Sequence, residues 1–173
     1  MLNKMVKNIP VSKLRNRSLK TNGRKHLPLP TGPFPKVASR DFMCGFSRKN
    51  GVLLRLFYPA IVDHKEQTIN PMLWSNWLPH ENYRRGYADV SGIKSDFLLR
   101  LIERTNRGEV FIPAIPNCKP YQLEGNQKFP VIIFSHGLGA CRTAYSSVCT
   151  EMASHGFVVA CINRLLVQII DWN

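Results

Sequence analysis

The sequence predicts an α/β fold, and three neighbouring segments near the end of the chain carry that prediction. The first is a short β-branched run at residues 131–134, Val-Ile-Ile-Phe, which follows a proline. The second begins at Thr143 and repeats its apolar residues every three or four positions, as a helix with one buried face does. The third is another apolar run at residues 157–162. Strand, helix and strand in this order form a βαβ unit with parallel strands and a right-handed crossover.

Upstream of this unit, one further strand is predicted at residues 51–59, Gly-Val-Leu-Leu-Arg-Leu-Phe-Tyr-Pro. Pro59 ends it, because proline has no N–H to donate to a neighbouring strand. Residues 60–128 mix short apolar runs with Pro, Asn and Gly, so we expect much of this region to be loop.

The helix of the βαβ unit has a well-marked end. Its apolar positions are Ala144, Val148, Met152 and Ala153, and Gly156 follows where a left-handed glycine commonly closes a helix. Both apolar strands have the character of strands buried on two faces, which a two-stranded parallel sheet cannot achieve alone. We therefore expect further βαβ units, and we expect them outside these 173 residues.

The net charge of +13 is concentrated at one end of the chain. Residues 1–40 hold ten of the 24 Lys and Arg residues and none of the 11 acids. We expect a basic, proline-rich and disordered tail over residues 1–40, a folded domain over 41–162 and a divergent tail over 163–173. The basic tail is expected to contact anionic lipid or nothing at all. Nucleic-acid binding is not expected, because no aromatic residue interleaves the basic run from Lys4 to Lys25.

We expect a cytoplasmic protein that contacts membranes at most peripherally. No apolar run approaches the ~18–20 residues that cross a bilayer, and the basic tail lacks the apolar region of a secretory signal. A tail that is basic and free of acids partly resembles a mitochondrial transit peptide, so mitochondrial import is a minor alternative. The five cysteines form no Cys-x-x-Cys pair and no zinc spacing with the histidines, which predicts reduced thiols.

The turn at residues 135–139, Ser-His-Gly-Leu-Gly, is the one place where the sequence indicates chemistry. Gly137 and Gly139 allow a tight turn, and the N–H groups at a helix start have no partner within the helix. An N–H so placed can stabilise the oxyanion that forms when an ester carbonyl is attacked. The alternative is a tight strand-to-helix turn without chemistry. We interpret His136 as a structural residue rather than a base.

Several motifs together resemble the platelet-activating-factor acetylhydrolases. The strongest similarity lies at residues 130–160 and includes Phe-Ser-His-Gly-Leu-Gly-Ala at 134–140, Arg-Thr-x-Tyr-Ser at 142–146 and Met-Ala-Ser-His-Gly-Phe-Val-Val-Ala at 152–160. Farther upstream, Leu-Phe-Tyr-Pro at 56–59 and Met-Leu-Trp at 72–74 also fit that family. The resemblance spans roughly residues 40–162 and implies the early strands and the oxyanion-loop βαβ unit of an incomplete α/β-hydrolase sheet.

The resemblance implies a serine esterase that removes short sn-2 acyl groups from phospholipids, a 1-alkyl-2-acetylglycerophosphocholine esterase, without metal or cofactor. By its match to the family motif, Leu138 would donate the oxyanion-hole N–H, with Gly137 and Gly139 shaping the turn. No Gly-x-Ser-x-Gly occurs in the sequence, so the family's Ser, Asp and His are expected beyond these residues. We therefore expect the 173-residue chain to be truncated before its nucleophile and inactive alone.

A second hypothesis is a non-catalytic truncated isoform that binds lipid or a protein partner. An unfinished parallel sheet exposes a strand edge and apolar faces, which could serve such binding. Family members also use an apolar helix to sit on lipid, and Ser91 to Arg104 falls where that helix should be. Its apolar stripe could equally be core; at helical spacing one face carries Ile93, Phe97, Leu98, Leu101 and Ile102.

Overall fold

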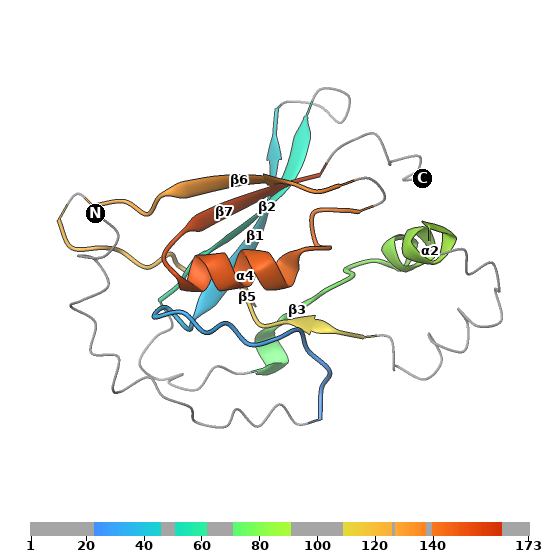
Figure 1. Cartoon of the computed structure of the whole chain (residues 1–173), viewed down its shortest axis with the longest axis horizontal. Helices are drawn as coiled ribbons and strands as arrows, with labels where there is room; N and C mark the ends of the chain where they lie inside the picture. Colours follow the sequence, from blue (N-terminus) through green and yellow to red (C-terminus); the bar gives the residue numbers. More distant parts are fainter. Residues whose placement is uncertain are drawn as a thin grey trace.

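The chain folds around a mixed five-stranded sheet that carries one helix on one face (Figure 1). This computed structural model describes residues 23–45, 51–61, 71–90, 109–125, 127–137 and 140–163. The strand order is β5-β1-β2-β7-β6. The strands are β1 (Val37–Cys44), β2 (Val52–Pro59), β5 (Ile115–Pro116), β6 (Val131–Ser135) and β7 (Val158–Ile162), and the helix on the sheet is α4 (Ser146–Ser154).

The smaller elements lie below and beside this sheet. Strands β3 (Ser75–Asn76) and β4 (Phe111–Ile112) form a separate antiparallel pair, preceded by the short 3-10 helix η3 (Pro71–Leu73). Helix α2 (Glu81–Val90) follows β3 and lies beyond the end of α4 that faces the β6–α4 loop (Figure 1). No helix in the part of the chain that the structure describes is long and apolar enough to cross a membrane.

The predicted βαβ unit is confirmed. Strands β6 and β7 pair in parallel from Val131↔Val158 to Ser135↔Ile162, and α4 connects them. The helix begins at Ser146, three residues after the predicted start, because residues 142–145 form a turn. Gly156 has φ +91°, the left-handed conformation that glycine adopts without strain, and it follows the helix as predicted.

The predicted strand at 51–59 is also confirmed, as β2, and it makes the sheet mixed. It pairs antiparallel with β1 along its whole length and antiparallel with β7 from Leu54↔Ile162 to Phe57↔Val159. The β1–β2 hairpin extends past the other strands (Figure 1). Sequence analysis missed β1, whose stretch Val-Ala-Ser-Arg-Asp-Phe-Met-Cys mixes charged and apolar residues without a clear period.

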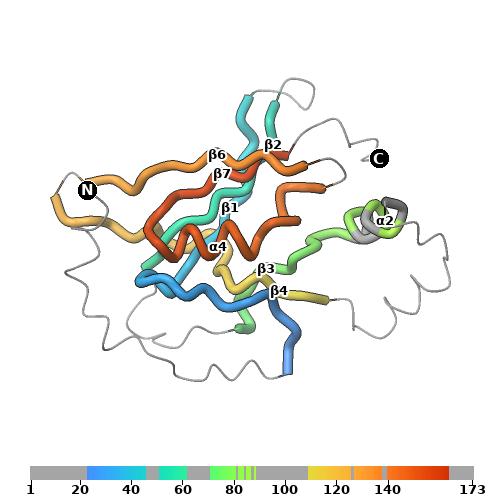
Figure 2. The backbone as a smooth tube through the Cα atoms, in the orientation of Figure 1, coloured from blue at the N-terminus to red at the C-terminus, as the bar shows by residue number. Residues whose placement is uncertain are grey.

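The expected disordered tail over residues 1–40 is wrong for its second half. From Gly23 onward the chain is part of the fold, and it runs beside α4 (Figure 2). The Thr31 N–H donates to the Glu151 carboxylate at 2.9 Å, and the Phe34 N–H donates to the Ser154 carbonyl at 2.9 Å. A Cβ on Gly32 would lie 2.2 Å from the Ser154 carbonyl oxygen, so this close crossing requires glycine. Residues 1–22 lie outside the described residues.

The domain also extends slightly past its expected end at 162. Asn163 is buried, and its N–H donates to the Leu53 carbonyl at 2.8 Å. Residues 164–173, the rest of the expected divergent tail, lie outside the described residues.

The larger of two core clusters sits between the sheet and α4, and the smaller, Ala38, Tyr58 and Ala60, lies on the other face of the sheet. Buried residues of β1, β2, β4 and β7 meet buried residues of the helix there, and Ile132 and Phe134 of β6 pack against them. The fully or almost fully buried members are Val37, Phe57, Ile112, Ala114, Cys149, Ala153, Val159 and Cys161. One apolar face of β6 is uncovered, as the sequence predicts for an unfinished parallel sheet. Val131 and Ile133 are 65% and 72% exposed, because the described residues cover only one face of this strand.

Candidate functional site

The candidate site is the loop that connects β6 to α4. Strands β6 and β7 are parallel, so their carboxyl ends, Ser135 and Ile162, reach the same edge of the sheet. Ligand sites in α/β sheets commonly lie outside this edge, where the loops leave the strands. The end of β1 and the start of β2 lie at that edge too, since Leu54 pairs with Ile162 and β2 runs the opposite way. The loop is therefore placed where a substrate site of this fold would be.

The loop begins with a buried residue, His136. His136 is 5% exposed, and its ring nitrogen Nδ1 lies 2.9 Å from the Gly137 carbonyl oxygen. A carbonyl only accepts hydrogen bonds, so Nδ1 carries the proton in this contact. That contact supports the interpretation of His136 as a structural residue. The Ala140 N–H donates to the same carbonyl at 3.3 Å and joins the two sides of the turn.

The residues predicted to form the oxyanion hole are only partly described. Gly137 is exposed, and the nearest described atom to a Cβ built on it would be the Tyr145 hydroxyl oxygen, 4.0 Å away. Leu138 and Gly139 lie outside the described residues, so the oxyanion-hole N–H remains a prediction. The apolar stripe from Ile93 to Ile102 also lies outside them.

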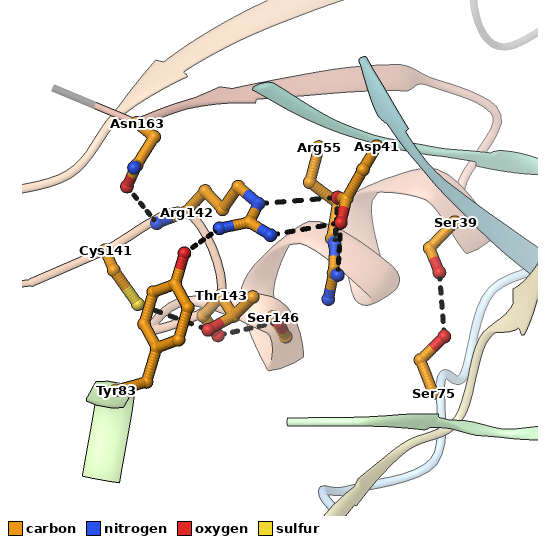
Figure 3. A network of polar contacts seen from close by, with 10 residues as sticks. All are labelled: Ser39, Asp41, Arg55, Ser75, Tyr83, Cys141, Arg142, Thr143, Ser146 and Asn163. Carbon is orange, nitrogen blue, oxygen red and sulfur yellow. Dashed lines mark hydrogen bonds and ion pairs between the residues drawn. The ribbon is translucent and has the colours of Figure 1, made fainter. Parts of the chain in front are cut away.

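The second half of the loop is held by Arg142, which is 6% exposed. Its guanidinium donates to the Asp41 carboxylate from Nε at 3.4 Å and from Nη2 at 3.1 Å, and Nη1 donates to the Tyr83 hydroxyl. Its backbone N–H donates to Asn163 Oδ1 at 3.3 Å. Arg142 therefore links the loop to β1, to α2 and to the end of β7 (Figure 3).

Asp41 binds a second guanidinium from the neighbouring strand. Arg55 on β2 donates to it from Nε at 2.6 Å and from Nη2 at 2.8 Å. Arg55 lies directly opposite Asp41 in the β1–β2 register and is itself buried. We refer to Asp41, Arg55, Tyr83 and Arg142 together as the Asp41 cluster.

The electrostatics of the Asp41 cluster favour the ionised forms. Burial raises the pKa of Asp41, but the hydrogen bonds and positive charges of Arg55 and Arg142 outweigh it and lower the pKa from 3.8 to about 2. Burial lowers the pKa of Arg142, but its contacts with Asp41 and Tyr83 raise it overall. The cluster holds two guanidinium groups against one carboxylate, and among the described residues the buried Nη1 of Arg55 has no hydrogen-bond partner.

Neutral hydrogen bonds hold the residues that follow Arg142. The Thr143 carbonyl accepts from Trp77 Nε1 at 2.7 Å and from the Ser146 hydroxyl at 2.7 Å. Thr143 and Ser146 are both fully buried. The Thr143 carbonyl is thus held both by Trp77, which follows β3, and by the first residue of α4.

Arg142 belongs to a sequence motif that indicates no role for it, and no local pattern points to Asp41, Arg55 or Tyr83 as site residues. One signal was available. Arg55 interrupts the apolar run Leu53-Leu54-Arg55-Leu56-Phe57, and a charge within a buried strand requires a partner. The partner itself could not be named, because Asp41 and Arg142 are 101 residues apart in the sequence.

Metal and thiol chemistry find little support in the described ranges. Within them, no group of three or more His, Cys, Asp or Glu side chains could hold a metal ion. All five cysteines are free thiols, as predicted, and Cys149 and Cys161 are buried in the core. A hydrogen bond with Cys161 and burial raise the pKa of Cys149, which suits a packing role.

Comparison with known proteins connects this loop to a family. The family model for platelet-activating factor acetylhydrolase, isoform II, matches residues 19–164. The platelet-activating factor acetylhydrolase of Cavia porcellus is 36% identical over 142 residues, which are 82% of this chain and 29% of that protein. The Bos taurus enzyme of the same name is 35% identical over 155 residues, 89% of this chain and 32% of that protein.

Two further similarities are more distant. A putative phospholipase A2 of Schizosaccharomyces pombe is 33% identical over 158 residues, covering 80% of this chain and 32% of that protein. Among solved structures, a ferulic acid esterase from Streptomyces cinnamoneus superposes with a TM-score of 0.55 at 13% identity, covering 81% of this chain and 36% of that one. This likeness supports the fold alone, a partial α/β-hydrolase sheet as predicted. The chain spans between 29% and 32% of the length of these curated relatives.

Proposed function

This chain belongs to the platelet-activating factor acetylhydrolase family, and we propose that it contributes the oxyanion loop of a serine esterase that removes short sn-2 acyl groups from phospholipids. The observation that carries the proposal is the β6–α4 loop. Its Ser-His-Gly-Leu-Gly sequence lies within the family match and at the carboxyl edge of a parallel strand pair. Loops at this position supply half of the oxyanion hole in α/β-hydrolases.

The chemistry proposed for the loop is charge stabilisation. A serine hydroxyl attacks the ester carbonyl, the carbonyl carbon becomes tetrahedral, and its oxygen becomes an oxyanion. The Leu138 N–H is proposed to donate to that oxygen, and one such donor contributes about 10²–10³-fold to kcat. His136 takes no part in proton transfer in this scheme, because it is buried and bonded to the turn.

The nucleophile is proposed to lie outside residues 1–173. The sequence contains no Gly-x-Ser-x-Gly motif, and loss of the whole triad costs about 10⁶-fold in kcat. We propose that the purified 173-residue chain hydrolyses no sn-2 acetyl ester. Turnover that can be titrated with an active-site reagent would contradict this part of the proposal.

The proposal is tested by labelling a native cell extract with a fluorophosphonate and recovering peptides from residues 131–160. A labelled polypeptide clearly larger than 19.8 kDa that contains those peptides would support the esterase. If those peptides occur only in an unlabelled species of 19.8 kDa, the esterase proposal is wrong for this gene product. Fractionation of the same extract tests the proposed cytoplasmic location and its mitochondrial alternative.

Contact with a lipid surface is proposed through the apolar stripe from Ile93 to Ile102, and the β1–β2 hairpin supports it. Close to the end of β1 and the start of β2, at the same sheet edge as the candidate loop, Phe42, Met43 and Val52 are 38%, 50% and 38% exposed. Exposed apolar residues beside a lipid-binding site favour insertion into a bilayer surface. Co-sedimentation with phosphatidylcholine vesicles should weaken when the stripe is made polar, and unchanged binding would contradict its role.

A second candidate function is a non-catalytic chain that binds a protein partner or lipid. It is favoured by β6, the last strand in the order, which has a paired neighbour on one side only among the described residues. Its exposed Val131 and Ile133 form an apolar surface beside that edge. The labelling experiment separates the two candidates, because only the esterase predicts a labelled polypeptide.

A further inference from the structure

We propose that Arg142 is a positioning residue for the oxyanion loop: through the Asp41 cluster it fixes the backbone of residues 140–146, the second half of the loop, on the sheet. The inference rests on the proposed esterase function. It concerns residues for which neither the family match nor the loop motif specifies a role. Arg142 contacts the loop framework rather than the substrate, and it acts through the backbone that carries it.

Contacts from three separate segments of the chain meet at Arg142. Arg142 lies three residues after Gly139, and its contacts reach segments that are far apart in the sequence (Figure 3). The carboxylate of Asp41 comes from β1, the hydroxyl of Tyr83 from α2, and the amide oxygen of Asn163 from the end of β7. A residue bonded to three different elements cannot shift along or across the sheet without breaking one of these bonds.

The guanidinium of Arg142 contacts the Asp41 carboxylate at two points. Nε and Nη2 face the two oxygens of one carboxylate, the paired arrangement that only arginine provides. A paired contact defines the orientation of the guanidinium plane as well as its position. The same carboxylate is clamped from β2 by Arg55, again with two bonds. Asp41 therefore cannot turn to follow a displaced Arg142, and the loop is tied to a rigid point.

Burying the charged groups of the Asp41 cluster costs free energy. Removing a guanidinium from water is unfavourable, and apolar residues of similar volume often replace buried ion pairs without loss of stability. The space between the sheet and α4 is otherwise filled by apolar and small residues. The Asp41 cluster places charges beside the β6–α4 loop, which carries the chemical motif. We explain these charges by the geometry that they impose on the loop backbone rather than by added stability. Misplacing a reacting group by about 1 Å can cost about 10²-fold in rate.

The consequence is that loop order and catalytic rate should fall together when the contact is weakened. In the tyrosine variant Tyr83→Phe, Arg142 loses one hydrogen bond and the rest of the cluster stays intact. In Arg142→Lys the charge is kept but the paired contact is lost, and in Arg142→Gln both are lost. The matched control is Arg40→Gln, which removes a positive charge from the same hairpin, where Arg40 is exposed and stacks over the Phe42 ring.

Two readouts test the role. The first is amide hydrogen exchange of the purified chain at residues 140–146, where the Ala144 and Ser146 amides donate to Cys141 and Thr143. Exchange there should be about tenfold to a hundredfold faster in Arg142→Gln, and intermediate in Arg142→Lys and Tyr83→Phe. Amides of β2 and β7 should keep their protection, and Arg40→Gln should match the wild type. Wild-type exchange at 140–146 in a folded Arg142→Gln or Tyr83→Phe variant would overturn the proposal.

The second readout is kinetic and uses the polypeptide that the fluorophosphonate labels. Arg142→Lys should lower kcat for a water-soluble short-chain ester about 10²-fold and leave KM within about threefold. A fall in stability alone would lower the amount of active enzyme, measured by titration, without changing kcat per active site. Unchanged kcat per site would overturn the positioning role. If no polypeptide is labelled, the esterase proposal fails instead, while the exchange experiment still decides whether Arg142 orders the loop.

Discussion

The two faces of the five-stranded sheet are built from alternating residues of the same strands, yet they differ in what they contact. The face under α4 carries the buried apolar core, with Phe57, Val159 and Cys161 at 0–2% exposure, and the charged Asp41 cluster beside it. The opposite face has a smaller buried cluster, Ala38, Tyr58 and Ala60, while elsewhere on it Val131 and Ile133 of β6 are mostly exposed and Phe42 is partly so. An apolar run in the sequence therefore specifies a strand, whereas the neighbours of that strand in space decide which of its faces is buried.

Placing a charge on each face of the sheet tests most directly whether the two faces differ in burial. Val159→Asp on β7 should cost more than about 4 kcal/mol of unfolding free energy, because the carboxylate would be buried without a partner. Val131→Asp on β6 is the matched change on the exposed face and should cost no more than about 1 kcal/mol. Urea denaturation of the purified chain, followed by circular dichroism, measures both. Equal costs would mean that the two faces do not differ in solution.

The two faces can also be compared on the single strand β1, where Asp41 lies on the face under α4 and Arg40 on the other. Asp41→Asn leaves two buried guanidiniums without their carboxylate, and we expect a loss of about 2 kcal/mol, reduced from the value for a fully buried pair because the Asp41 side chain is 37% exposed. Arg40→Gln, one residue earlier and on the other face, should change the unfolding free energy by no more than about 1 kcal/mol. Denaturant unfolding at pH 7 distinguishes the two. A loss in Arg40→Gln as large as in Asp41→Asn would contradict the assigned difference.

Acid should erase the stabilisation that Asp41 provides. The pKa of Asp41 is lowered from 3.8 to about 2 in the folded chain. Its contribution is therefore complete above about pH 4 and decreases as the pH falls from 3.8 through 2, since the unfolded chain takes up the proton first. The stability difference between the wild type and Asp41→Asn should shrink over this interval, measured by denaturant unfolding at several pH values. A difference that stays constant down to pH 2 would mean that the carboxylate is not held by the two arginines.

The smallest effect on stability is expected on the exposed face, where solubility changes instead. Replacing Val131 and Ile133 together by lysine should alter the unfolding free energy by about 0.5 kcal/mol or less. Charges on an edge strand oppose strand-to-strand association, so the variant should show less self-association than the wild type in sedimentation velocity. An equally monomeric wild type would indicate that this edge does not associate by itself.

Much of the parallel unit followed from the sequence. The run Val131–Phe134, the three- and four-residue spacing after Thr143 and the glycine at 156 all report on local geometry, and each led to the right element. The chemical motif was also local. Its last two residues, Leu138 and Gly139, lie outside the described part of the chain, so their role stays a prediction.

The errors have a common physical cause. Strand β1 contains Arg40 and Asp41, which read as surface residues, and it is a strand because β2 pairs along its whole length. Residues 23–36 have the composition of a tail, and they are held by Glu151, Ser154 and the rings of Tyr121 and Phe129. In both cases the partners are distant in the sequence, and no local pattern names them.

The sequence by itself determined the βαβ unit, the strand that ends at Pro59, the reduced thiols and the family, because periodicity, backbone-restricted residues and contiguous motifs are properties of neighbouring positions. Only the tertiary structure decided that the basic segment from Gly23 packs beside α4, that β6 is covered on one face, and that Arg142, Asp41 and Arg55 form one cluster. Burial of a charge depends on partners brought together from β1, β2, α2 and the loop, and that meeting is a result of folding.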